Sequence, residues 1–261
     1  MSESEPKGTA GSSPKEVGVR AVNRALDLLV ELSDWRRPAG LSELAARVGL
    51  HPSTAFRLLE SLQSRGFVYQ TADDRTYKLG NRNLELGAAF RRSYSVWSRA
   101  EDHAIQLAES IGETVSVGVL DKGEVLYIAV ARGQRDYGMA MDAGTRHPAY
   151  CTSLGKAILA EMSEQAIREI VRNHPPVPLT PNTLVDASDL LRDLAATRRR
   201  GFSIDNEERV PGIFCVGAAV RDLDGTLVGA LSISGPVQRM HQKGIENLSS
   251  TVIRAAKALG Q

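Results

Sequence analysis

The fold is decided by one stretch, "LSELAARVGLHPSTAFRLLESLQSRGFV", residues 41–68. It carries two apolar stripes with the spacing i, i+3, i+4, i+7, one over residues 41–48 and the other over residues 55–62. This spacing puts the apolar side chains on one face of an α-helix. Only the short link "GLHP" lies between the two stripes, so the stretch predicts a helix-turn-helix.

The residues that flank these two helices support the assignment. Another stripe over residues 25–32 predicts a helix that precedes the pair. Ser42 can cap the second helix, and Pro52 suits the first turn of the third. Gly49 and Gly66 follow the second and third helices, where a left-handed residue is favoured. We therefore expect three short helices in the first domain.

Beyond the third helix the pattern changes to that of strands. Phe67, Tyr69, Tyr77 and Leu79 alternate with other residues around the polar turn "ADDR". Such alternation predicts a β-hairpin. Three helices followed by a hairpin form a winged helix-turn-helix, which we assign to residues 17–80.

The predicted winged helix has the side chains that DNA contact requires. Small hydroxyl groups at the start of the third helix allow close approach, and Arg57 can reach a guanine edge or a phosphate. Residues 15–99 hold 14 Lys and Arg against 9 Asp and Glu, whereas residues 100–261 hold 17 against 20. A basic N-terminal part fits a nucleic-acid-binding module. The candidate DNA contacts are Ser53, Thr54, Arg57, Arg65, Arg75, Lys78, Arg20 and Arg24.

The rest of the chain predicts a linker and a second domain. Residues 81–98 have the pattern of a linker helix, and residues 99–261 mix strand and helix patterns. The expected strands are "TVSVGVLD", "EVLYIAVAR", "FSIDNEE", "IFCVGAAVRD" and "GTLVGALSIS", and a closing helix is expected from about His241. The fold class is therefore α+β, with a mainly antiparallel C-terminal sheet flanked by helices.

The segment "VRDLDGTLVG", residues 220–229, resembles the nucleophile motif of aspartate-dependent phosphatases. Such an enzyme needs a parallel sheet and an acidic metal site downstream of the nucleophile. Only 37 residues follow Asp224, and Glu246 is the sole carboxylate among them. The segment instead predicts a hairpin turn, in which Gly225 takes a positive φ and Asp222 bonds the turn backbone.

Other catalytic and cofactor sites are not predicted. His147, Cys151 and Cys215 do not have the spacing of metal ligands. No glycine-rich phosphate loop is found, so we expect neither a metal nor a cofactor.

Targeting signals are not evident in the sequence. No run approaches the roughly 18 uncharged apolar residues of a membrane span. Residues 1–16 are polar, lack an apolar signal-peptide core and are expected to form a disordered tail. The two cysteines suit a reducing compartment. We therefore expect a cytoplasmic protein with no membrane partner.

Several motifs resemble those of one family. "VNRALDLLVELS", the stretch over residues 41–68 and "YKLG" resemble the DNA-binding domain of IclR-type bacterial transcriptional regulators, and "TSLGKAILA", "GFSIDNEE", "FCVGAAVRD" and "GALSISGP" resemble their effector domain. The resemblance implies a GAF-like effector-binding domain and a linker helix that helps to pair two DNA-binding modules. It also implies a ligand-responsive repressor or activator of a catabolic operon, whose effector is a small organic acid or an aromatic metabolite.

The resemblance also carries effector residues over to this chain. Backbone amides at the start of the helix from Ser153 suit a carboxylate. Ser232 and Ser234 are two residues apart, so they share one face of a strand. Structural roles such as helix capping by Ser153 and strand packing by Cys215 remain open alternatives. The implied effector residues are Ser153, Leu154, Gly155, Asp205, Ile213, Cys215, Ser232 and Ser234.

The expected partners follow from this reading. A winged helix that binds a palindromic operator in double-stranded DNA is best presented by a dimer, because the symmetry of the half-sites mirrors that of the protein. We expect a homodimer or a dimer of dimers. Two alternatives remain open at this point: an enzyme with an accessory winged helix, and a winged helix that contacts another protein.

Overall fold

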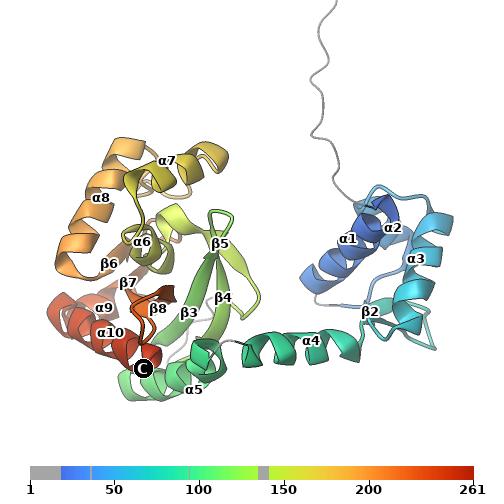
Figure 1. Ribbon diagram of the computed structural model, residues 1–261, viewed down its shortest axis with the longest axis horizontal. Coiled ribbons are helices and arrows are strands. Elements are labelled where there is room, and N and C mark those ends of the chain that lie inside the picture. Colours follow the sequence, from blue (N-terminus) through green and yellow to red (C-terminus); the bar gives the residue numbers. More distant parts are fainter. Residues whose placement is uncertain (1–18, 36, 94, 135–140) are drawn as a thin grey trace, which may run out of the picture. The chain divides into compact units, whose positions relative to one another are not determined.

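The computed structural model describes residues 19–35, 37–93, 95–134 and 141–261. The chain divides into two compact units, one up to Phe90 and the other from Arg91 to Gln261 (Figure 1). None of the helices in the described residues is long and apolar enough to cross a membrane.

The first unit is a winged helix-turn-helix, as predicted. Its elements are α1 (Arg20–Asp34), α2 (Leu41–Arg47), α3 (Pro52–Ser64), β1 (Val68–Gln70) and β2 (Tyr77–Leu79). Each helix contributes a fully buried leucine to one small core, namely Leu28, Leu44 and Leu59. Gly49 and Gly66 have φ of 64° and 76°, so both take the left-handed conformation expected after a helix.

Two local expectations in this unit were wrong. Gly40, not Ser42, precedes α2, and no side chain caps that helix. In the hairpin, Val68 and Tyr77 are buried, whereas Tyr69 is 52% exposed. The alternation was misplaced because Phe67 precedes the strand, where its carbonyl oxygen accepts a hydrogen bond from the N–H of Gly80.

The range 81–98, in which a linker helix was expected, holds α4 (Asn81–Arg92) and only the beginning of α5 (Ser95–Ile111). Helix α4 contains no buried residue. Helix α5 buries small side chains at a helical spacing, such as Ala100, Ala104 and Ala108, against the sheet of the second unit.

The second unit is built on a six-stranded sheet in the order β5-β4-β3-β8-β7-β6, with all neighbours antiparallel. The strands are β3 (Thr114–Asp121), β4 (Glu124–Ala131), β5 (Arg146–Pro148), β6 (Ser203–Asn206), β7 (Ile213–Arg221) and β8 (Leu227–Pro236). The edge strand β5 was not predicted, because three residues carry no readable alternation.

Helices cover both faces of this sheet (Figure 1). They are α6 (Ser153–Leu159), α7 (Glu164–Asn173), α8 (Ala187–Arg200), α9 (Val237–Lys243) and α10 (Ile245–Gly260), with a short 3-10 helix at Ala149–Cys151. Helices α5 and α10 pack on one face, and α6 packs on the other. A single closing helix was expected from about His241. The structure instead has two helices: α9 begins at Val237, and Gly244, whose φ is 80°, separates it from α10.

The segment that resembled a phosphatase motif is the β7–β8 turn, as predicted. The Asp222 carboxylate accepts hydrogen bonds from the N–H groups of Asp224 (3.1 Å) and Thr226 (2.8 Å). Gly225 has a φ of 79°, which glycine adopts without steric cost. The carboxylate therefore shapes the turn.

Candidate DNA-binding and effector sites

The exposed face of α3 is the first candidate site. Ala55 and Leu59 anchor the opposite face in the core, which directs Arg57 and Phe56 to solvent. Phe56 is 37% exposed and was not selected in the sequence analysis. An exposed phenyl ring beside an arginine can contact a thymine methyl group.

The start of α3 is fixed by its own polar groups. Pro52 begins the helix, and the His51 ring accepts a hydrogen bond from the backbone N–H of Ser53 (3.4 Å). The Ser53 hydroxyl lies 2.8 Å from the same ring nitrogen, so it also contributes to the cap. Thr54 is half-buried, whereas Arg57 is exposed. Of these three predicted contacts, Ser53 and Arg57 are exposed, and the Ser53 hydroxyl is engaged in the cap.

Two predicted contacts, Arg65 and Lys78, line one groove of about 550 Å³. Arg82, which the sequence analysis did not select, lies in the same groove and pairs with Glu85 at 2.6 Å. Three cations against one carboxylate make this groove suited to a phosphate group. The remaining predicted contacts are elsewhere: Arg75 is near the tip of the hairpin, and Arg20 and Arg24 are on α1.

The second candidate site is the face of the sheet that packs against α6. Strand register places Asp205, Cys215 and Ser234 side by side across β6, β7 and β8. Two residues further along the strands, Ser232 lies beside Ser116 on β3. These five side chains are buried, and they form a polar cluster that we call the polar face. Ile213 lies two residues before Cys215 on the same side of β7.

One hydroxyl of the polar face lacks a partner. The Ser116 oxygen is buried and makes no hydrogen bond to any described residue. A buried hydroxyl without a partner costs free energy, about 1–3 kcal/mol. A bound molecule with a polar group would remove that cost.

The start of α6 excludes the alternative role of Ser153 as its cap. Thr152, not Ser153, caps the helix, and its hydroxyl accepts the N–H of Gly155 at 3.1 Å. That amide is therefore already satisfied and is not open to a carboxylate. A Cβ at Gly155 would lie 2.2 Å from the carbonyl oxygen of Ala149, so close packing requires glycine here. Leu154 is fully buried in the apolar core, which gives it a packing role.

Asp205 is the acidic member of the polar face. Burial raises the pKa of its carboxyl to about 7, and the nearby negative charge of Glu208 adds to this shift. The carboxylate accepts a hydrogen bond from the backbone N–H of Glu208 at 2.8 Å, and this bond opposes the rise in pKa. A group with this pKa changes its charge near neutral pH.

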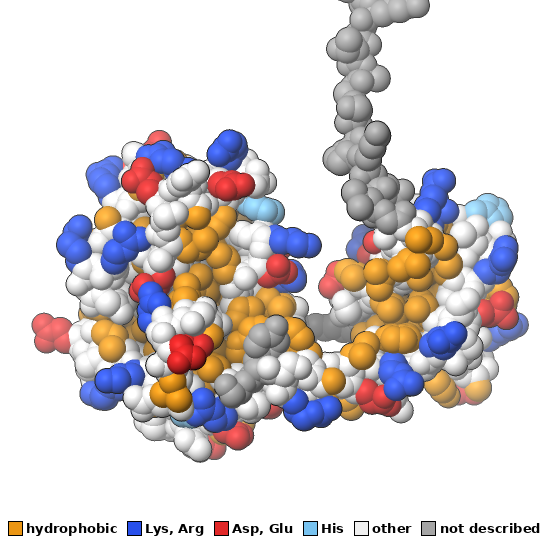
Figure 2. Space-filling view, in the orientation of Figure 1, with side chains coloured by type: hydrophobic (Ala, Val, Ile, Leu, Met, Phe, Trp, Pro, Cys, Tyr) orange, Lys and Arg blue, Asp and Glu red, His pale blue; other side chains and the backbone are white. Residues whose placement is uncertain are grey.

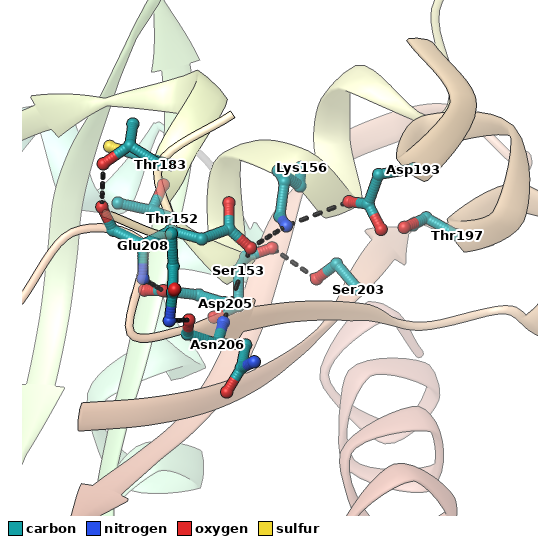
Figure 3. Close-up of polar contacts among 12 residues, drawn as sticks. Thr152, Ser153, Lys156, Thr183, Asp193, Thr197, Ser203, Asp205, Asn206 and Glu208 are labelled. Atoms are coloured by element: carbon teal, nitrogen blue, oxygen red, sulfur yellow. Dashed lines mark hydrogen bonds and ion pairs between the residues drawn. The ribbon is translucent and has the colours of Figure 1, made fainter. Parts of the chain in front are cut away.

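A buried ion-pair network adjoins Asp205 (Figure 3). The Lys156 ammonium is 1% exposed and lies 2.5 Å from Glu208 and 2.9 Å from Asp193. The Ser153 carbonyl oxygen next to this network accepts a hydrogen bond from Ser203. The network thus ties α6 to α8 and to the loop that follows β6. None of its charged residues was selected from the sequence, because a motif does not show which charges meet in the interior.

A cation and an imidazole lie beside these groups; the sequence analysis did not select the cation and considered the imidazole only as a metal ligand. The guanidinium nitrogen Nη2 of Arg209 lies 2.7 Å from Nδ1 and 3.2 Å from Nε2 of His147. Burial and then the charge of Arg209 lower the pKa of His147 to about 4. Tyr127 packs edge-on against the His147 ring, with 5.0 Å between the ring centroids. The two partners are far apart in the chain, so no local pattern could have joined them.

Both cysteines are buried thiols. Burial raises the pKa of Cys151 to about 12, and it raises that of Cys215 well above its usual range. The thiolate is the nucleophilic form of cysteine, so these residues are suited to packing and weak hydrogen bonding.

Comparison with known proteins identifies the family of both domains. A model of the IclR helix-turn-helix domain matches residues 21–72, and a model of the bacterial transcriptional regulator IclR C-terminal domain matches residues 90–261. The HTH-type transcriptional regulator BhcR of Paracoccus denitrificans is 34% identical over 256 residues, with 97% of this chain and 91% of that protein covered. The transcriptional repressor IclR of Escherichia coli is 32% identical over 253 residues, with 96% and 92% covered.

Solved structures share the fold. The crystal structure of an IclR homolog from Microbacterium hydrocarbonoxydans, complexed with 4-hydroxybenzoate, has a TM-score of 0.83 at 22% identity and covers 92% of this chain and 97% of that chain. The relatives are transcriptional regulators, which removes the alternative of an enzyme with an accessory winged helix. The chain belongs to the IclR family of bacterial transcriptional regulators.

Proposed function

We propose that the protein is a ligand-responsive regulator that binds the operator of a catabolic operon in the cytoplasm. The observation that carries this proposal is the exposed face of α3, with Arg57 and Phe56 held outward by the buried side of the helix. The groove lined by Arg65, Lys78 and Arg82 supplies positive charge for the DNA backbone. Direct readout is assigned to α3, and phosphate contact to the groove.

The second unit supplies the effector site in this proposal. The polar face presents hydroxyl, thiol and carboxyl groups in a buried setting, which suits a small polar metabolite. An IclR homolog of the same fold binds 4-hydroxybenzoate, which supports a small organic acid or an aromatic metabolite as effector. To act, the effector must bind two arrangements of the protein unequally, typically by roughly 1–3 kcal/mol. A repressor among the relatives favours repression that the effector relieves.

Self-association is part of the proposal. Val22, Leu26 and Val30 lie at i, i+4 and i+8 on α1 and are 53%, 53% and 61% exposed. Figure 2 shows apolar side chains gathered over the first unit, where α1 lies. An apolar stripe of this kind is unfavourable in water and favourable against a second copy. We assign it to a homodimer that binds a palindromic operator.

A selection from random-sequence duplex DNA tests this function. The full-length protein is expected to enrich an inverted repeat whose half-sites lie about one helical turn apart, or a multiple of it. Selection without protein provides the control for amplification bias. Recovered sequences with no shared motif would contradict a regulator that recognises an operator.

A further inference from the structure

Arg209 is a cation with an unusual environment. Its guanidinium contacts the neutral imidazole of His147, and none of the described Asp and Glu residues forms an ion pair with it. By contrast, the buried Lys156 has two acidic partners, Glu208 and Asp193. A half-buried guanidinium whose contact is an imidazole retains donors and a charge that a ligand can use.

The contact between Arg209 and His147 lies across the polar face. Arg209 follows β6, and His147 belongs to β5, so the two residues come from opposite edges of the sheet. Neighbouring strands are about 4.8 Å apart, and a flat sheet of this size would separate its edges by roughly 24 Å. The contact is possible because the sheet curls, and the guanidinium therefore lies over the strands between the two edges.

The positive charge of Arg209 also affects other titratable groups of the site. Burial raises the pKa of Tyr127, Cys215 and Cys151, and in each case the charge of Arg209 opposes the shift. The geometry agrees for Tyr127, because its ring packs on His147, the imidazole that the Arg209 guanidinium contacts. The Arg209 side chain is in reach of a molecule bound on the polar face.

We propose that Arg209 is the anchor for the carboxylate of the effector, and that the effector is a small monocarboxylate with an uncharged hydrogen-bonding group at its other end. This inference rests on the proposed effector site and names its ligand class. A planar guanidinium binds a carboxylate through two parallel hydrogen bonds. Arg209 would bind the carboxylate in place of the Gly155 N–H, which already donates a hydrogen bond to the Thr152 hydroxyl.

The acidic side of the site explains why the far end of the ligand is uncharged. The Asp205 carboxylate accepts the backbone N–H of Glu208, and the negative charge of Glu208 raises the pKa of Asp205, so Asp205 is the acidic group nearest the polar face. Glu208 is already paired with Lys156, so a second carboxylate on the ligand would meet Asp205, and two ionised carboxylates in one buried site disfavour each other. A hydroxyl or carbonyl group can instead bond Ser116, whose buried oxygen lacks a partner among the described residues, or Ser232 and Ser234.

The test measures binding of matched probes to the full-length protein. The panel holds monocarboxylates of increasing size with a hydroxyl at the far end, from glycolate to 4-hydroxybenzoate, together with the amide and the dicarboxylate analogue of each. Titration calorimetry is expected to show binding of one or more monocarboxylates and much weaker binding of their amide and dicarboxylate analogues. Arg209→Gln is expected to lower the affinity for the carboxylate roughly 10- to 100-fold and to leave amide binding unchanged.

Two variants control for folding and for charge. Arg199→Gln removes an exposed cation of the same unit and should bind like the wild type. Arg209→Lys keeps the charge but loses the planar fork, so intermediate affinity is expected. Equal carboxylate binding by the wild type and Arg209→Gln would overturn the anchor while leaving the effector site in place. Preference for amides or dicarboxylates, or a panel that does not bind at all, would overturn the ligand class. The DNA selection above tests the regulator function independently of these results.

Discussion

The ammonium of Lys156 and the carboxylate of Glu208 form an ion pair of 2.5 Å in which both side chains are buried, at 1% and 7% exposure. Lys156 is on α6, and Glu208 follows β6. Burial raises the pKa of Glu208, and the charge of Lys156 opposes that shift. The pair therefore holds a charged loop beside the polar face.

Lys156→Met is expected to destabilise the fold by about 3–5 kcal/mol at neutral pH, because it leaves Glu208 buried without its cation. Adding Glu208→Leu should recover part of the loss, since the double variant contains no orphaned charge at this pair. Urea unfolding measures both effects, and the exposed Lys257→Met is the control. If the stability lost in the double variant equals the sum of the losses in Lys156→Met alone and Glu208→Leu alone, the two residues do not interact.

Asp205→Asn is expected to stabilise the protein more at about pH 8 than at about pH 5. The folded-state pKa of Asp205 is raised from 3.8 to about 7, so between these values the folded protein holds a proton that the unfolded chain has released. Wild-type stability from this group therefore falls as the pH rises through that window and stays reduced above it.

Asparagine does not titrate, so the variant lacks the pH dependence that Asp205 gives to stability. His147 and Glu208 contribute to the pH dependence of both proteins, so their contributions cancel to first order in the comparison with the wild type. Urea unfolding at the two pH values measures the difference, with the exposed Asp224→Asn as control. A stability difference that does not change with pH would mean that the carboxyl is ionised in the folded protein throughout.

Ser232→Ala combined with Ser234→Ala is expected to weaken the response to the monocarboxylate that binds the wild type, while DNA binding without ligand stays intact. The two hydroxyls belong to the buried polar face and lie far along the chain from α3. Operator binding with and without the probe measures both properties. If the double variant loses ligand-free DNA binding, the two serines have a structural role instead.

Leu26→Glu combined with Val30→Glu is expected to shift the protein toward monomers, because it places two charges in the exposed apolar stripe of α1. Sedimentation velocity measures the change. Leu223→Glu provides the matched control, since Leu223 is 79% exposed in the β7–β8 turn of the other unit. An unchanged distribution of species would assign the subunit contact to another surface.

The elements that sequence predicts well are those with strong local patterns. The apolar stripes of α1 to α3, Gly49, Gly66 and the turn at Gly225 each follow from a steric or solvation rule that acts within a few residues. The predicted cap of α2 was wrong because serine and glycine are both allowed at the start of a helix. The prediction of one closing helix was wrong because Gly244 divides one periodic pattern into two helices.

The site was less predictable for a physical reason. Register brings Asp205, Cys215 and Ser234 together, and the alternation of strands already implied that Ser232 and Ser234 share a face. The contact between Arg209 and His147 depends on the curl of the whole sheet, which no local pattern encodes. Phe56 lies outside the apolar stripe of α3, so its exposure follows from the helical spacing.

The most direct test of the regulator function is fluorescence-anisotropy binding to the operator that the selection yields, in a salt series and against scrambled DNA. Specific binding that weakens steeply with salt is expected, because phosphate contacts release counterions. Arg57→Ala should cost specific binding roughly 1–3 kcal/mol, whereas Arg168→Ala, an exposed arginine of the other unit, should have no effect. Binding that shows neither preference over scrambled DNA nor dependence on salt would contradict operator recognition and would favour a winged helix that contacts another protein.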